Sequence, residues 1–301
     1  MWIYYSLILL SVVMFGGGFA CQNLYRKKRG SDLRISMEAA CIGSMAGLIV
    51  LLAINGFAFE YTPFTLLMAF LVALNSLAFT FCAFRALDYI NLSLFSLFSM
   101  LGGMVLPFFQ GILFYDEEFT LAKGVCVVFI IAALLCTLEK GEKKKGAIFY
   151  AGVFVLNGMS GVLSKIFTTS TLPKASPVGY SVWGAAITMI LSAIVWLVLS
   201  QREKRRALAD GVAIEKIQRT VIWQSYGIGA LNGAINKVAN FLLVLALVHV
   251  DASIQYPMVT GGTMIVSTAL SFFDDKKPNK KEILGVFLAF LGMLALFLIP
   301  V

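Results

Sequence analysis

The sequence has few charged residues, a single histidine and no closely spaced cysteine pair, and each shortage excludes a class of protein. Charged residues make up 13% of the 301 residues and hydrophobic residues 59%, whereas a soluble domain carries about 25% charged residues. One histidine, His249, cannot build a multi-histidine metal site. The five cysteines lie in or beside apolar stretches, where we expect them to pack. A soluble enzyme, a disordered chain and a disulfide-rich secreted scaffold are therefore excluded.

Long apolar runs dominate the chain instead. The mean hydropathy is +0.88, and each run is long enough to cross a hydrocarbon core of about 30 Å as a helix. Because lipid offers no partners to backbone polar groups, a spanning run must be helical. The runs cover residues 2–25, 37–59, 62–84, 90–115, 120–138, 146–168, 177–200, 221–248, 252–274 and 281–299. We therefore predict an all-α membrane protein with ten transmembrane helices, short connections and no second, water-soluble domain.

Lysine and arginine are concentrated in alternate connections. The connections after the first, third, fifth, seventh and ninth runs hold twenty basic residues, whereas the others, with the ends of their runs, hold three. Basic residues favour the cytoplasmic side, so we predict a plasma-membrane protein with both termini outside. The net charge of +8 then reflects topology and attraction to an anionic lipid bilayer, not nucleic-acid binding. The longest connection, 201–220, is compatible with a short interfacial helix or a solvated basic loop.

The two halves of the chain resemble each other. Residues 86–104 (ALDYINLSLFSLFSMLGGM) and 246–264 (ALVHVDASIQYPMVTGGTM) share an Ala-Leu start, a serine at the eighth position and a Gly and a Met near the end. We interpret this similarity as a duplicated five-helix unit, with residues 1–140 and 146–301 as the two repeats; chance similarity between apolar helices is the alternative. Because five is odd, the second repeat would enter the membrane inverted. Inverted repeats are typical of alternating-access transporters, whose site lies near the midplane between the halves.

The stretch 85–124 resembles the EamA-type pattern of the drug/metabolite transporter superfamily. It has an Ala-Leu pair before the fourth run, Pro107 within that run, an acidic residue after it (Glu117 or Glu118) and Gly124 opening the fifth run. The resemblance implies ten helices, a duplication of five helices and transport, often export, of small metabolites. Many members have cytoplasmic termini, whereas the charge distribution here predicts the opposite.

Lys237 is the main candidate for a binding residue. It lies near the middle of the run 221–248, where a lysine costs about 2.5–3.5 kcal/mol on insertion scales. Because the acidic residues lie near the ends of the runs, we do not expect an internal ion pair to offset this cost. An anionic substrate group or a water-lined cavity would offset it. A structural lysine bonded to backbone carbonyls or asparagines is the alternative.

Polar residues within the apolar runs complete the candidate binding site. The candidates besides Lys237 are Asn75, Asn157, Asn232, Asn236, Gln255 and Tyr256. Asn232 and Asn236 are four residues apart, on one helical face next to Lys237, and Asn75 matches Asn236 in the first repeat. Asparagines at this depth can equally join helices through hydrogen bonds, which is the structural alternative.

A central lysine without a deep carboxylate favours an anionic or zwitterionic solute, such as an amino acid or organic acid, over a drug cation. We therefore predict a secondary active transporter of a small polar metabolite, an exporter that needs no cofactor or metal. The alternative is a channel or a structural membrane subunit without saturable transport. A membrane enzyme would need His, Asp or Glu clustered near one interface, whereas this sequence has one histidine and scattered carboxylates. A homo-oligomer is compatible with the sequence.

Overall fold

All regular secondary structure in the described part of the chain is helical. The computed structural model describes residues 2–114, 120–137, 146–209, 219–247, 250 and 252–298, with the backbone alone at 134, 137, 207, 244, 247, 252–257 and 296–298. Its helices are α1 (Trp2–Arg29), α2 (Leu33–Ile54), α3 (Pro63–Tyr89), α4 (Leu92–Phe114), α5 (Leu121–Thr137), α6 (Ala147–Thr169), α7 (Pro177–Ala209), α8 (Arg219–Leu247), α9 (Ala252–Ser271) and α10 (Lys280–Leu298). Each helix coincides with one of the predicted runs.

The length and composition of the helices are those of a membrane protein. Among the described residues, six helices are long and apolar enough to cross a bilayer: α1, α2, α3, α4, α6 and the Pro177–Arg206 part of α7. Shorter apolar segments occur in α5 and α9. Large apolar side chains such as Leu67, Ile131 and Leu197 are exposed on the outside of the bundle. A soluble monomer does not expose apolar surface on this scale, so lipid is the natural partner of these faces.

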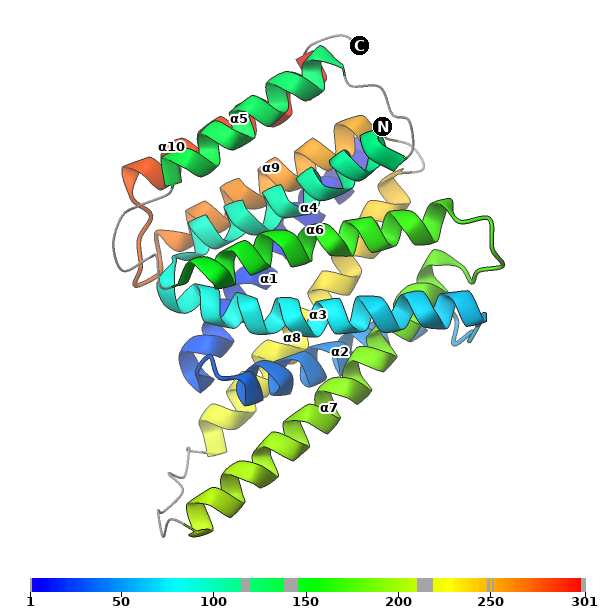
Figure 1. The fold of residues 1–301 in the computed structure, drawn as a ribbon, viewed down its shortest axis with the longest axis vertical. Coiled ribbons are helices and arrows are strands. Elements are labelled where there is room, and N and C mark those ends of the chain that lie inside the picture. Colours follow the sequence, from blue (N-terminus) through cyan, green and yellow to red (C-terminus); the bar gives the residue numbers. More distant parts are fainter. Residues whose placement is uncertain are drawn as a thin grey trace.

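The helix pairs that pack most closely join the first five helices to the last five. α1 packs on α8 and α9, α4 on α6 and α9, and α3 on α6 and α7. α2 packs on α7 and α8, and α5 pairs with α10 at one edge of the bundle (Figure 1). Residues 1–140 and 146–301 are therefore intertwined and do not form two separate bodies.

The largest apolar core surrounds α4. Phe95, Leu97 and Leu101 of α4 are fully buried, and they cluster with apolar side chains of α3, α5, α9 and α10. Ser93 is also buried, and its hydroxyl is 2.8 Å from the Thr268 hydroxyl of α9. α4 therefore anchors the part of the bundle that lies beside α5 and α10.

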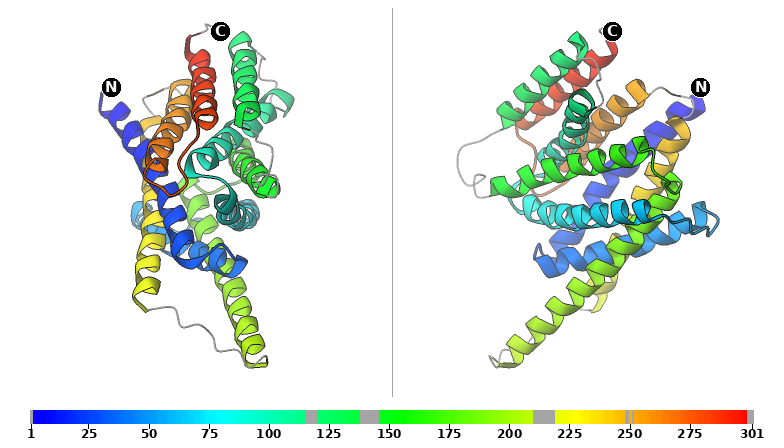
Figure 2. Two further views of the ribbon diagram at one scale, coloured as in Figure 1. Left: turned by 90° about the vertical axis from the view of Figure 1, so that its left-hand side faces the viewer. Right: turned by 45° about the vertical axis from the view of Figure 1, so that its right-hand side comes forward.

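The C-terminal ends of α2 and α7 differ from the sequence prediction in ways that matter for the fold. α2 stops at Ile54 instead of continuing to residue 59, because the chain turns there with Gly56 and Phe57 both at a φ of 59°. The prediction of a separate interfacial helix or loop over 201–220 is wrong in its first half. α7 continues through Ala209 and extends beyond the rest of the bundle (Figure 2), with residues 201–206 exposed. Residues 210–218 lie outside the described part of the chain.

The C-terminal ends of α1, α3, α7 and α9 lie at one end of the bundle, on the left in Figure 1, here called the basic end. Ion pairs join Arg26 to Asp88 and Arg34 to Glu203 there, both with N–O distances of 2.7 Å. At the other end, the Ser176 N–H donates to Glu60 at 3.1 Å, which joins the α2–α3 connection to the α6–α7 connection. The described helix ends that carry these bonds therefore lie at opposite ends of the bundle.

Gly102→Ala tests the close contact between α4 and α6. A Cβ at Gly102 would lie 2.0 Å from the backbone oxygen of Phe154, so alanine must push α4 and α6 apart. Overpacking typically costs about 1–3 kcal/mol, and we expect the melting temperature of the purified protein to fall by at least about 3 °C. Gly17→Ala is the matched control, because a Cβ there would meet nothing within 4 Å. Equal melting temperatures of the two variants would contradict this packing.

Candidate functional site

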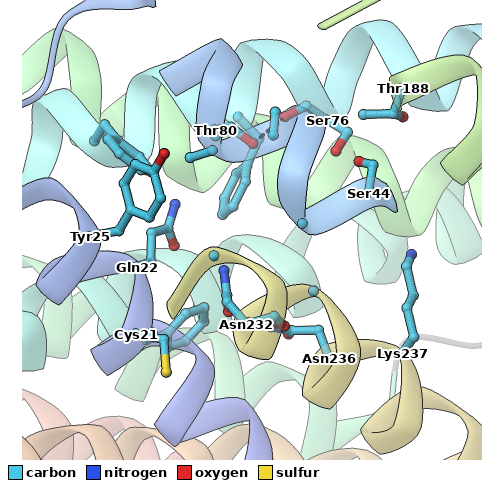
Figure 3. Close-up of a pocket in the computed structure, with 18 residues that line it drawn as sticks. Cys21, Gln22, Tyr25, Ser44, Ser76, Thr80, Thr188, Asn232, Asn236 and Lys237 are labelled. Carbon is cyan, nitrogen blue, oxygen red and sulfur yellow. Dashed lines mark hydrogen bonds between the residues drawn. The ribbon is translucent and has the colours of Figure 1, made fainter. Parts of the chain in front are cut away.

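A cavity of about 220 Å³ lies between α1, α2, α3, α7 and α8, and Lys237 lines it. Its wall combines small residues, aromatic rings and uncharged polar groups. The polar lining residues are Cys21, Gln22, Tyr25, Ser44, Ser76, Thr80, Thr188, Asn232, Asn236 and Lys237 (Figure 3). Three of the five helices come from the first half of the chain and two from the second, so the cavity lies between the halves.

Lys237 is the single charged side chain among the described residues that line the cavity. Its side chain extends from α8 toward Ser44 of α2, Ser76 of α3 and Thr188 of α7 (Figure 3). Its aliphatic stem lies against α2, because a Cβ at Gly47 would meet the Lys237 Cγ at 3.0 Å. No described residue forms a hydrogen bond or ion pair with its ammonium, and the side chain is half-buried. The ammonium is therefore available to solvent or to a bound molecule.

Asn232 and Asn236 also line the cavity, and they contact each other. The Asn236 amide donates to the Asn232 side-chain oxygen and to the Asn232 backbone oxygen, both at 2.8 Å. A Cβ at Gly18 would meet the Asn236 amide nitrogen at 2.7 Å, so the absence of a side chain at Gly18 lets α1 and α8 approach at this point. The two asparagines therefore present a pre-ordered polar surface beside Lys237.

Asn75 and Asn157 do not line the cavity. The Asn75 amide donates to the Leu156 backbone oxygen at 2.9 Å, which joins α3 to α6. The Asn157 amide donates to the Ser99 backbone oxygen at 2.6 Å, which joins α6 to α4. Both side chains act as interhelical hydrogen-bond donors, as the structural alternative expected.

Gln255 and Tyr256 lie in the first turns of α9, and their side chains lie outside the described part of the chain. No described residue of α9 is among those that line the cavity. α9 packs on α1, α4 and α10. The structure therefore brings together Lys237, Asn232 and Asn236 from the predicted set and leaves the predicted role of Gln255 and Tyr256 untested.

Several cavity residues were absent from the predicted set. Ser44, Thr188 and Tyr25 lie in apolar runs, where a single hydroxyl is common and carries no distinctive pattern. Thr188 donates to the Gly184 backbone oxygen at 2.7 Å. Because serine and threonine hydroxyls in helices commonly form such bonds, a hydroxyl in the sequence does not by itself indicate a cavity residue. The one feature of the sequence that could have indicated a cavity residue here is Ser44, a small polar residue with Gly43 before it and Gly47 after it.

A buried ion pair lies directly behind the cavity wall. The Tyr25 hydroxyl donates to Glu38 Oε1 at 2.8 Å, and the Arg29 guanidinium donates to both Glu38 oxygens at 2.7 and 2.9 Å. Glu38 is 1% exposed. Tyr25 also lines the cavity, whereas Glu38 does not. Glu38 is therefore compensated by Arg29 and is not presented to a ligand.

Further bonds at the basic end join α1 to the connection between α9 and α10. Lys27 pairs with Asp274, and with Asp275 at 2.7 Å. Burial alone would raise the pKa of the Asp274 carboxyl, but hydrogen bonds from Lys27, Asp275 and Asn23 outweigh it and lower the pKa below its usual value. Asp274 therefore stays ionised at neutral pH, and the two halves remain joined at this end.

Comparison with known proteins gives the fold and nothing about the activity. The sequence matches no family model and no curated protein. A protein of known crystal structure is similar over 96% of this chain and 97% of its own, with a TM-score of 0.58 and 15% identity. At this identity the likeness concerns the fold alone. Among the described residues, no group of three His, Cys, Asp or Glu side chains is placed to hold a metal ion.

Glu38→Gln tests the buried ion pair. The change leaves the Arg29 charge buried without its partner, which typically costs about 3–5 kcal/mol, so we expect a large drop in the thermal stability of the purified protein. Glu203→Gln is the matched control, because Glu203 pairs with Arg34 but its side chain is 57% exposed. An exposed pair contributes about 0–1 kcal/mol. Similar losses in both variants would contradict the structural role given to Glu38.

Proposed function

We propose that the protein is a secondary active transporter of a small polar metabolite, anionic or zwitterionic, that works by alternating access. It would span the plasma membrane ten times as two inverted five-helix repeats and belong to the drug/metabolite transporter superfamily. Export is the direction that the family resemblance implies. The observation that carries the proposal is Lys237, which has no described counter-ion and lines a cavity between the two halves of the chain.

The helix contacts support the inverted repeat. If α1–α5 correspond to α6–α10, the contact of α1 with α8 corresponds to that of α6 with α3. Likewise α4 with α6 corresponds to α9 with α1, and α2 with α8 to α7 with α3. The remaining close pairs, α2–α7, α4–α9 and α5–α10, correspond to themselves. A two-fold relation between inverted halves would produce this pattern, and alternating access uses it to exchange the conformations of the halves.

The bonds at the basic end favour a gated cavity rather than an open pore. Lys27–Asp274 joins the two halves there, and Arg29–Glu38 holds Tyr25 against the cavity. A transporter must close one side while the other is open, and ion pairs between the halves can provide that closure. In the proposed cycle, these bonds would close the basic end while the other end is open.

Lys237→Met tests the proposed transport function. Methionine keeps the length of the side chain but removes the charge, so a substrate anion would lose its counter-ion. We expect the variant to lose saturable counterflow in proteoliposomes, once a transported solute has been found by screening metabolites for stabilisation of the purified protein. Lys165→Met on α6 is the matched control, because Lys165 does not line the cavity.

Two outcomes would contradict this proposal. Undiminished counterflow in Lys237→Met would remove the assigned role of the ammonium. Flux that does not saturate and shows no counterflow in the wild-type protein would identify a channel instead.

Cysteine labelling tests the proposed orientation. In a variant without the five native cysteines, Gln201→Cys lies at the basic end and Thr171→Cys at the other, both at exposed positions. Because basic residues favour the cytoplasmic side, we expect a membrane-impermeant maleimide to label Thr171→Cys on intact cells, and Gln201→Cys after permeabilisation alone. The reverse pattern would place both termini in the cytoplasm.

A further inference from the structure

The charges around the cavity restrict its ligand more narrowly than the transport proposal does. Lys237 contributes one positive charge, and no described carboxylate lines the wall. The buried carboxylate of Glu38 accepts a hydrogen bond from Tyr25, which lines the cavity, and is paired with Arg29. The cavity can therefore compensate one negative charge on a ligand. A second negative charge or an ammonium on the ligand would be desolvated without a charged partner, which is costly.

The hydroxyls opposite Lys237 suit a carboxylate. Ser44 and Ser76 have no side-chain hydrogen-bond partner among the described residues, so their hydroxyls are able to donate to a ligand. Figure 3 shows both on the side of the cavity toward which the Lys237 ammonium points. One ammonium and two hydroxyls can serve the two oxygens of a carboxylate. A phosphate monoester carries about −1.5 to −2 charges at pH 7, which exceeds the single positive charge here.

The rest of the cavity suits an uncharged, partly apolar group. Tyr25 and Gln22 lie away from Lys237 (Figure 3), and the rings of Tyr25 and Phe84 are 5.9 Å apart. The rings of Phe19 and Phe79 also line the cavity. The volume of about 220 Å³ lies below the roughly 300–1,000 Å³ typical of sites for drug-sized molecules. The ligand is therefore small.

From these features we infer that the cavity binds a small monocarboxylate whose remaining part is uncharged and partly apolar. The carboxylate lies against Lys237, Ser44 and Ser76, and the uncharged part lies against the aromatic rings. This inference rests on the proposed function, and it selects organic monoanions over amino acids, dianions and phosphorylated metabolites.

Four probes of nearly equal size test this inference on the full-length protein. They are 3-phenylpropionate (a monoanion), 3-phenylpropanamide (neutral), phenylalanine (a zwitterion) and phenethyl phosphate, which carries more than one negative charge. We expect 3-phenylpropionate to raise the melting temperature and to bind with a Kd at least tenfold lower than that of each other probe. Lys237→Met should abolish this preference, whereas Lys165→Met should retain it.

Ser44→Ala combined with Ser76→Ala serves as a second variant in case Lys237→Met does not fold. It should weaken the binding of 3-phenylpropionate and leave that of the amide within a factor of two. Stronger binding of phenylalanine or of the phosphate, or no binding of any probe, would overturn the inference. Counterflow of phenylalanine would overturn it while supporting transport. Binding of 3-phenylpropionate without counterflow of any solute would support the site and contradict the transport proposal.

Discussion

An ammonium group in the middle of a membrane is stable only where water or an anion reaches it. If α8 spans the membrane as proposed, insertion scales assign its central lysine a cost of about 2.5–3.5 kcal/mol, and the protein has to offset this cost. Lys237 has no described carboxylate partner, but it lines a cavity with hydroxyl and amide groups. The cavity is therefore what makes the lysine tolerable, and the lysine in turn determines which molecules the cavity can hold.

Close contacts between helices make this arrangement possible. A Cβ at Gly233 of α8 would lie 1.9 Å from the backbone oxygen of Gly43 on α2, so a side chain at Gly233 would separate the two helices. Gly18 allows α1 to approach the asparagine pair on α8 in the same way. Small residues commonly permit such approach in membrane bundles. Here they bring α1, α2 and α8 around the cavity, while the ion pairs at the basic end hold the helix ends together.

The apolar runs predicted the helices well, because length and hydropathy decide whether a segment spans a bilayer. The ends were harder to predict. Residues 55–59 are largely apolar but contain a turn with positive φ at Gly56 and Phe57, and the charged residues 202–206 continue α7 because arginine, lysine and glutamate are good helix formers.

The cavity was predicted in part. Lys237, Asn232 and Asn236 stood out as polar residues at membrane depth, and the structure brings them together. Asn75 looked equivalent to Asn236, but its amide is bonded to the backbone of α6. Sequence spacing gives the depth and face of a side chain, whereas the neighbouring helix decides whether it meets a backbone oxygen or a cavity. The buried contact of Glu38 with Arg29 and Tyr25 depends on the same information about neighbouring helices.

The accessibility of position 237 to water is the most direct test of the central claim. In a background without the native cysteines, Lys237→Cys and the outward-facing Leu231→Cys on the same helix would be treated with a charged, water-soluble thiol reagent and with a lipid-soluble maleimide. A solvated cavity predicts that the charged reagent modifies Lys237→Cys and spares Leu231→Cys. Modification of Lys237→Cys by the lipid-soluble reagent alone would place the side chain in lipid and contradict the cavity.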